Sequence, residues 1–186
     1  DSKKLKKLLK NKKINNSLLT LKKFNPSKKT RILNSHNHII RLDKDPLNFT
    51  YDQKLIENKI KSNLKNTKII IISDYNKGTI NNLKKIIAIG KKNKIQVFVD
   101  SKKKNIKEFS GSYLVKPNEK EFKELFLSKI KNKYSNTKIL KLMKFNKINN
   151  LLLTLGKNGM KLFSNNKVKN YYSTKKNVYD VTGAGD

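Results

Sequence analysis

The sequence predicts an α/β domain in which helices cover both faces of a mainly parallel central sheet, a three-layer α/β/α arrangement. Two observations support this fold class. Apolar runs such as Ile69–Ile72 are rich in β-branched residues and lack polar alternation, which is typical of strands buried on both faces. Apolar patterns of helical spacing separate these runs, and alternating strands and helices imply parallel strands joined by right-handed crossovers.

The clearest elements lie from residue 69 onward. After the strand Ile69–Ile72, an amphipathic pattern predicts a helix, with Thr79 as the expected N-cap and Gly90 as the expected stop. The later elements are expected to be strands at Ile95–Val99 and Tyr113–Val115, a helix opened by Pro117-Asn118, a helix over about Thr137–Phe145 and a strand at Leu151–Leu155.

The first 68 residues have weaker patterns. Leu5, Leu8 and Leu9 predict the apolar face of an N-terminal helix. Strands are expected at Thr30–Leu33 and His38–Leu42, followed by a helix over residues 51–64. We therefore treat residues 1–186 as one partial domain, in which residues 1–68 form a helix, a strand pair and a second helix, and residues 69–186 form an α/β core.

The charge of the chain raises a different possibility, a basic nucleic-acid-binding protein. The sequence has 45 Lys and Arg residues against 13 Asp and Glu residues, a formal net charge of +32. However, lysines occur on nearly every segment, and no zinc-finger, helix-turn-helix or aromatic platform pattern is found. We therefore expect a solvated basic surface without a specific nucleic-acid partner, although nonspecific contacts with polyanions are favoured at low salt.

Other functional classes are excluded by composition. The chain has no Cys, which excludes disulfides, thiolate metal sites and a Cys nucleophile. Its apolar runs, such as Ile69–Ile72 and Leu151–Leu153, are far shorter than the roughly 20 residues that cross a membrane. The start of the chain does not resemble a signal peptide. We expect a cytoplasmic location and no membrane partner.

Polar residues follow the ends of successive predicted strands. In open α/β sheets, ligands bind beyond the carboxyl ends of the strands. Because several such residues occur on neighbouring strands, they indicate one shared site. These residues are Asp74, Asp100, Asn118, Thr154 and Gly156.

The last residues, Asp180–Asp186, suggest the chemistry of this site. In Gly183-Ala184-Gly185, two of the three residues lack Cβ, so backbone amides can approach an anion closely. Asp186 would repel that anion. Its carboxylate is better placed to take a proton from a hydroxyl group that attacks phosphorus. A Gly-rich turn that ends in a helix cap is the alternative interpretation.

These motifs resemble those of the ribokinase-like (PfkB) carbohydrate kinases, and the similarity extends from about residue 30 to the end of the chain. The Asp-Tyr-x-Lys-Gly and Thr-Arg…Arg-Leu-Asp elements resemble one subgroup, the D-glycero-β-D-manno-heptose-7-phosphate kinases, which occur alone or fused to an adenylyltransferase. One departure is Ser101, where the family usually has Pro. The matching segments are Thr30–Leu33, Ile40–Asp43, Ser73–Gly78, Asp100–Lys102, Lys116–Phe122, Thr154–Met160 and Val178–Asp186.

The resemblance implies a ribokinase-like fold and an activity. The implied reaction is ATP-dependent phosphorylation of heptose 7-phosphate at the 1-hydroxyl, which supplies ADP-heptose for lipopolysaccharide core. ATP and Mg²⁺ are the implied cofactors, with a monovalent cation such as K⁺ as a further candidate, and a homodimer is the implied assembly. Ribose, a fructose phosphate or a nucleoside are the alternative acceptors, because other kinases of this fold use them.

The resemblance also implies roles for particular residues. Asp186 would be the catalytic base and Gly183, Ala184 and Gly185 the anion hole, while Glu121 would reach Mg²⁺ through water. The implied ATP-binding residues are Lys116, Asn118, Glu119, Lys120, Glu121, Thr154, Gly156 and Gly159. The implied substrate-binding residues are Arg31, Arg41, Asp74, Tyr75, Lys77, Asp100 and Lys102.

Several of these residues have a structural alternative. Asn118 and Glu121 match the spacing of a capping box at a helix start. Asn158-Gly159 matches a type I′ hairpin turn, which would explain Gly159 without a ligand. The two arginines, Arg31 and Arg41, could be solvated charges on strand surfaces.

Finally, the family pattern begins late and ends early in this sequence. The first matching element lies past the position of the family's initial strand, and the chain ends where the helix behind the anion hole should begin. We therefore expect N-terminal and C-terminal parts of the fold to be missing. We also expect exposed apolar surface and no kinase activity from these 186 residues alone.

Overall fold

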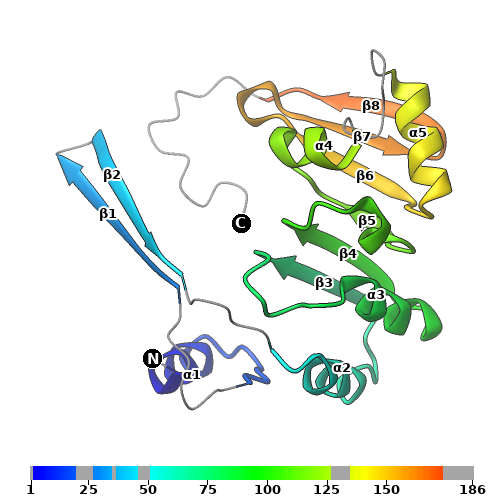
Figure 1. The fold of residues 1–186 in the computed structure, drawn as a ribbon. Coiled ribbons are helices and arrows are strands. Elements are labelled where there is room, and N and C mark those ends of the chain that lie inside the picture. Colours follow the sequence, from blue (N-terminus) through cyan, green and yellow to red (C-terminus); the bar gives the residue numbers. More distant parts are fainter. Residues whose placement is uncertain (1, 20–26, 35–36, 46–50, 127–134, 174–186) are drawn as a thin grey trace.

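The structure, a computed structural model, describes residues 2–19, 27–34, 37–45, 51–126 and 135–173 (Figure 1). Its main body is a six-stranded sheet with strand order β3-β4-β5-β6-β7-β8. The strands are β3 (Ile69–Asp74), β4 (Gln96–Ser101), β5 (Leu114–Val115), β6 (Asn150–Thr154), β7 (Met160–Ser164) and β8 (Lys167–Tyr171). The pairs from β3 to β6 are parallel, and β7 and β8 are added antiparallel, which confirms a mainly parallel sheet.

One helix precedes β3, the others connect the parallel strands, and the helices begin at side-chain caps. They are α2 (Gln53–Lys61), α3 (Leu83–Lys92), the 3₁₀ helix η1 (Ile106–Phe109), α4 (Glu119–Phe126) and α5 (Asn136–Phe145). The N-caps Asp52, Asn82 and Ser135 each accept a hydrogen bond from a backbone amide of the first turn. Such caps satisfy amides that have no partner inside the helix.

Both predicted boundaries of α3 were wrong. The helix begins after Asn82 rather than Thr79, because the Asn82 side chain accepts the amide of Lys85 at 3.0 Å. The helix continues past Gly90 to Lys92. Gly90 instead allows close packing on the sheet, because a Cβ built there would lie 2.3 Å from Cγ2 of Val97.

One face of the sheet forms the core. Strand register places Ile72, Val99, Val115, Leu151 and Phe163 in a single row across five strands. All five side chains are buried, in one cluster with buried residues of α3, η1, α4 and α5. Because side chains in register point to the same face, these helices cover that face.

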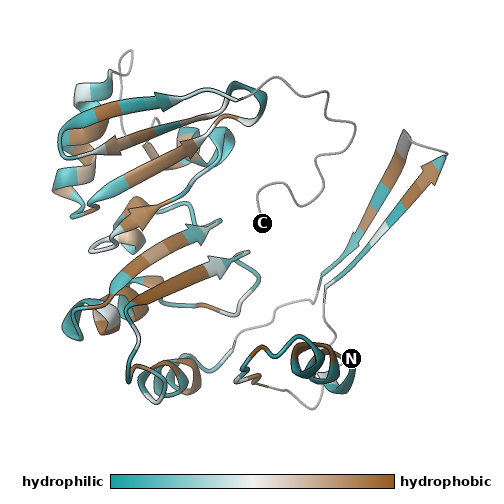
Figure 2. Ribbon diagram, turned by 180° about the vertical axis from the view of Figure 1, so that it is seen from behind, coloured by the Kyte–Doolittle hydropathy of each residue, from teal (hydrophilic) through white to brown (hydrophobic). Residues whose placement is uncertain are grey.

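The opposite face of β3 is open. Ile69 and Ile71 are 50% and 77% exposed, so the prediction that this strand is buried on both faces was wrong. No helix of the described residues lies over β3 and β4 in the view from behind (Figure 2). The helices described here thus cover one face, and the third layer expected from the sequence is not seen among them. The expectation of exposed apolar surface is confirmed.

The N-terminal part extends away from the main sheet (Figure 1). Strands β1 (Lys28–Asn34) and β2 (Asn37–Lys44) form a separate antiparallel sheet, as predicted. The helix α1 (Ser2–Asn11) has no buried residue, and its apolar face is exposed at Leu5 and Leu8. Among the described helices, none is long and apolar enough to span a membrane.

The connection between β6 and β7 differs from the predicted two-residue turn. Strands β6 and β7 do pair as a hairpin, but a short 3₁₀ helix, η3 (Gly156–Asn158), connects them in place of a two-residue turn at Asn158-Gly159. The next hairpin, β7–β8, has the two-residue turn. Asn165 and Asn166 there have φ values of 49° and 59°, as a type I′ turn requires.

Candidate functional site

Two adjoining cavities lie at the carboxyl ends of β3 and β4. The first, about 300 Å³, is lined by Ser27, Lys29, Asp45, Ser73, Asp74, Tyr75, Lys77, Thr79 and Ile80. The second, about 210 Å³, is lined by Ser73, Asp74, Tyr75, Asp100, Lys102, Lys116, Asn118, Glu121 and Thr154. Four of the five predicted strand-end residues line these cavities, whereas Gly156 lines neither.

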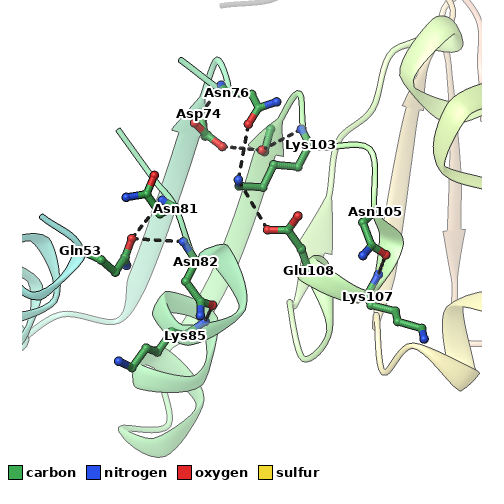
Figure 3. A network of polar contacts seen from close by, with 11 residues as sticks. Gln53, Asp74, Asn76, Asn81, Asn82, Lys85, Lys103, Asn105, Lys107 and Glu108 are labelled. Atoms are coloured by element: carbon green, nitrogen blue, oxygen red, sulfur yellow. Dashed lines mark hydrogen bonds and ion pairs between the residues drawn. The ribbon is translucent and has the colours of Figure 1, made fainter. Parts of the chain in front are cut away.

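Asp74 belongs to both cavities and is the buried carboxylate between them. Its side chain is 4% exposed. One oxygen accepts the Ser101 hydroxyl at 2.8 Å, and the other accepts the amide of Asn76 at 2.9 Å (Figure 3). Strand pairing explains the first contact, because Asp74 and Ser101 are partners in the β3–β4 register. A buried carboxylate with two donors is rigidly held.

Ser101 therefore makes hydrogen bonds that Pro, the usual residue of the resembled family at this position, could not make. Its hydroxyl donates to Asp74 and accepts the amide of Lys103 at 3.3 Å. The Lys103 ammonium continues this network to Asn76 at 3.4 Å and to Glu108 at 3.5 Å (Figure 3). The turn after β4 is thus tied to the turn after β3 by hydrogen bonds.

Tyr75 forms the wall between the cavities and contacts a lysine on each side. The ammonium of Lys29 lies 5.3 Å from the ring centroid, and that of Lys102 lies 4.8 Å from it. Both distances suit cation–π contacts. Lys29 lines the first cavity and Lys102 the second, so each cavity has a cation against the shared wall. Lys29 was missed in the sequence because nothing in its local pattern distinguishes it from other lysines of β1.

Lys77 is paired with a carboxylate of the hairpin. Its ammonium binds the side chain of Asp45, which directly follows β2. Hydrogen bonds from Lys77 and then Ser27 hold the pKa of Asp45 below its usual value, with smaller electrostatic contributions from Lys77 and Lys29. Asp45 therefore stays ionised at neutral pH. Like Lys29, it was missed because its partners are distant in sequence.

The second cavity ends at the start of α4. The Lys116 ammonium lies 2.8 Å from a carboxylate oxygen of Asp100. Asn118 and Glu121 each accept the other's backbone amide at 2.9 Å, which confirms the capping box. Thr154 is tied to the same turn, because its amide donates to the carbonyl of Pro117 at 3.1 Å.

The second cavity has the donors that a hydrated Mg²⁺ prefers. Asp100 and Glu121 contribute carboxylates, and Thr154 contributes a hydroxyl. Mg²⁺ usually keeps several waters and binds one or two carboxylates together with substrate phosphates. Over the described ranges there is no group of three or more His, Cys, Asp or Glu side chains that would hold an ion directly. These residues therefore fit an ion held partly through water.

The structure does not bring all predicted site residues together. Arg31 and Arg41 are cross-strand partners on the hairpin, where Arg41 pairs with Asp43 at 3.0 Å, and neither arginine lines a cavity. Glu119, Lys120 and Gly159 also lie outside both cavities. Gly159 has a structural reason instead: φ is 86°, and a Cβ there would lie 2.0 Å from the carbonyl oxygen of Tyr171. Gly183, Ala184, Gly185 and Asp186 lie outside the described residues.

Cations gathered at the carboxyl edge of a parallel sheet suit an α/β domain that binds phosphorylated small molecules. Residues 1–186 match the family model for pfkB family carbohydrate kinases, and the chain therefore belongs to that family.

Curated relatives support the same assignment. An uncharacterized sugar kinase from Buchnera aphidicola subsp. Schizaphis graminum is 37% identical over 183 residues, which cover 98% of this chain and 58% of the relative. The bifunctional protein HldE of Aliarcobacter butzleri is 36% identical, and that of Haemophilus ducreyi is 32% identical. The chain spans 39% and 38% of these two HldE proteins. It thus represents part of the length of the relatives it matches.

Solved structures support the fold. A protein designated Sa239 has a TM-score of 0.78 and 20% identity, over 99% of this chain and 61% of its own. Phosphofructokinase-2 from Escherichia coli, solved in complex with substrates and products, has a TM-score of 0.73 and 16% identity, over 98% of this chain and 62% of its own. The described sheet and helices are therefore part of a ribokinase-like fold.

Proposed function

We propose that the chain is part of a kinase that transfers the γ-phosphoryl group of ATP to the 1-hydroxyl of D-glycero-β-D-manno-heptose 7-phosphate. The main support is the pair of cavities that share Asp74 and Tyr75 and each have a lysine against the shared wall. Such a pair suits two anionic substrates that meet at a common boundary. The relatives named HldE support the heptose as acceptor, whereas the Buchnera relative supports only a sugar.

The second cavity is the proposed place of the ATP phosphates. Lys102 and Lys116 would offset their charge, and Asn118 and Thr154 offer hydrogen-bonding groups from a turn fixed by the capping box. Mg²⁺, held through water near Glu121 and Asp100, would neutralise charge on the triphosphate. A monovalent cation such as K⁺ is part of the proposal, because the E. coli phosphofructokinase-2 was also solved in complex with potassium.

The first cavity is the proposed acceptor site. Asp74 would hold sugar hydroxyls from its buried position. Asp186 would accept the proton of the 1-hydroxyl as that oxygen bonds to the γ-phosphorus and the bond from phosphorus to the β-phosphate oxygen breaks, releasing ADP. The amides of Gly183–Gly185 would stabilise the charge on the transferred group.

Glu121 gives a test of the proposed metal site. Glu121→Gln should shift the Mg²⁺ dependence of turnover to higher concentration, by several-fold, because one negative charge near the ion is lost. Gln can also occupy this position of a capping box, so the helix start should survive the change. The measurement is the initial rate of the product of the whole reading frame against free Mg²⁺ at saturating ATP. An unchanged Mg²⁺ dependence would leave Glu121 with the capping role alone.

We also propose a cytoplasmic homodimer that associates through the β1–β2 sheet. Ile32, Ile40 and Leu42 are about half exposed on this hairpin, and burial of such side chains favours association. A tetrameric form of E. coli phosphofructokinase-2 has also been solved. Sedimentation of the product of the whole reading frame, with and without Leu42→Lys, tests this assembly, since a mass that is monomeric in both cases would exclude it.

A panel of acceptors tests the proposed activity. ADP release is measured with the product of the whole reading frame that encodes these residues, against heptose 7-phosphate, fructose 6-phosphate, ribose and a nucleoside. The proposal predicts the highest kcat/KM for heptose 7-phosphate. A higher value for another acceptor would replace the heptose with that sugar. The nucleic-acid alternative predicts tight binding that persists at moderate salt, which a filter-binding salt series would detect.

A further inference from the structure

The carboxylate of Asp45 lies where an anionic ligand of the first cavity would be expected. The cavity has two ammonium groups, from Lys29 and Lys77, and hydroxyl groups from Ser27, Ser73 and Thr79. These groups are all suited to bind an anion. The two carboxylates of the cavity are used differently: Asp74 is buried and bound by Ser101 and Asn76, whereas Asp45 is partly exposed and bound by Lys77.

Asp45 is the ion-pair partner of Lys77 and lies in the electrostatic field of Lys29. Within the described ranges, Lys77 has no other carboxylate partner and Lys29 has none within ion-pair distance. If Asp45 moved away, neither lysine would have an ion-pair partner among the described residues, because the remaining carboxylate of the cavity, Asp74, is bound by Ser101 and Asn76.

The Asp45 carboxylate can readily be replaced on Lys77 by another anion. Both side chains are partly exposed to solvent, and exposed ion pairs contribute little to stability. A phosphate monoester carries more negative charge than one carboxylate and has three acceptor oxygens. It can therefore bind two ammonium groups at once, whereas Asp45 forms an ion pair with only one of them.

We propose that Asp45 is an internal substitute for the phosphate group of the acceptor sugar. An incoming phosphate monoester displaces the Asp45 carboxylate from Lys77 and binds Lys77 and Lys29 together. This inference rests on the proposed function for the identity of the ligand. It assigns the phosphate end of the acceptor to Lys29 and Lys77 instead of Arg31 and Arg41, which lie outside the cavity.

Displacement of Asp45 by a phosphate group would also make the first cavity specific for phosphorylated acceptors. A sugar without a phosphate group has no charge with which to displace Asp45, so Lys77 stays paired with Asp45. A phosphorylated sugar replaces that pair with stronger charge-assisted hydrogen bonds. Asp45 therefore acts as a specificity-determining residue that disfavours unphosphorylated acceptors.

The experiment titrates the chain with inorganic phosphate at constant ionic strength, with Kd measured by isothermal titration calorimetry. Asp45→Asn should tighten the Kd by about two- to fivefold, because it removes a competing carboxylate of an exposed ion pair. Lys77→Gln and Lys29→Gln should each weaken it. Glu124→Gln is the matched control: it removes the same charge from an ion pair of similar exposure, with Lys104, outside both cavities.

The expected result is a tighter Kd for Asp45→Asn and an unchanged Kd for Glu124→Gln. Equal shifts in the two variants would show a general charge effect and overturn the inference. An unchanged or weaker Kd for Asp45→Asn would also overturn it. The proposed function can fail independently of this inference. If no sugar-dependent ADP release were found but Asp45→Asn still tightened the Kd, the proposed kinase activity would be contradicted and the proposed phosphate-binding site would stand.

Discussion

Replacing Asp186 by Asn should lower kcat by about 10²–10⁴-fold and leave the KM values for ATP and sugar little changed. The amide keeps the shape of the side chain but cannot accept the proton of the attacking hydroxyl. Because the lost interaction belongs to the transition state, binding of the ground-state substrates should survive. Steady-state kinetics on the product of the whole reading frame measures both quantities.

Glu124→Gln is the control for this prediction. Glu124 pairs with Lys104 on the surface, lines neither cavity and has no proposed part in proton transfer. Its kcat should therefore stay close to the original value. Near-normal turnover in Asp186→Asn would remove Asp186 from the chemistry and favour the interpretation of a capped Gly-rich turn.

Replacing Phe109 by Ala should destabilise the chain by about 3–5 kcal/mol, the usual cost of truncating a buried Phe. Phe109 is fully buried, at 0% exposure, and belongs to the core cluster under the sheet. Since small domains are stable by only about 5–15 kcal/mol, this loss would remove a large part of the total. Urea unfolding followed by circular dichroism measures the change.

Phe145→Ala provides the comparison for Phe109. Phe145 is 79% exposed at the end of α5, so its truncation should change the free energy of unfolding by less than about 0.5 kcal/mol. Similar destabilisation by both variants would contradict the packing described here. It would show that the core does not depend on η1.

The order of strands and helices from β3 to β6 could be predicted because each element has a local signal. Ile69–Ile72 is a run of β-branched residues, and α3 and α5 have apolar residues at helical spacing. The location of helix starts was less predictable. Asn82 caps α3 because Gln53 of the distant α2 accepts the amides of Asn81 and Asn82 at 3.0 and 3.2 Å (Figure 3). A tertiary contact of this kind has no local pattern.

Burial was also predicted only in part. An unbroken apolar strand indicates that both faces can be covered, but it does not say what covers them. In β3, alternate residues separate cleanly: Ile72 is buried against the helices, and Ile71 on the other face is exposed. The sequence of β3 is therefore consistent with a covered strand, while the described residues cover one face of it.

The residues of the candidate site were likewise predicted only in part. Asp74, Asp100, Asn118 and Thr154 were predicted because the topology of a parallel sheet places strand ends at one edge. Lys29 and Asp45 were not, because they come from the hairpin and meet the sheet only in three dimensions. Arg31 and Arg41 were proposed from the family resemblance, and the hairpin holds them away from both cavities.

The central claim, that this chain belongs to a kinase acting on a sugar phosphate, is tested most directly by identifying the product. The product of the whole reading frame is incubated with ATP, Mg²⁺ and D-glycero-β-D-manno-heptose 7-phosphate, and the mixture is followed by ³¹P NMR. The account predicts that ADP and a second sugar phosphate signal, coupled to the anomeric proton, appear together in equal amounts. ADP that forms with inorganic phosphate and without a second phosphate on the sugar would contradict it.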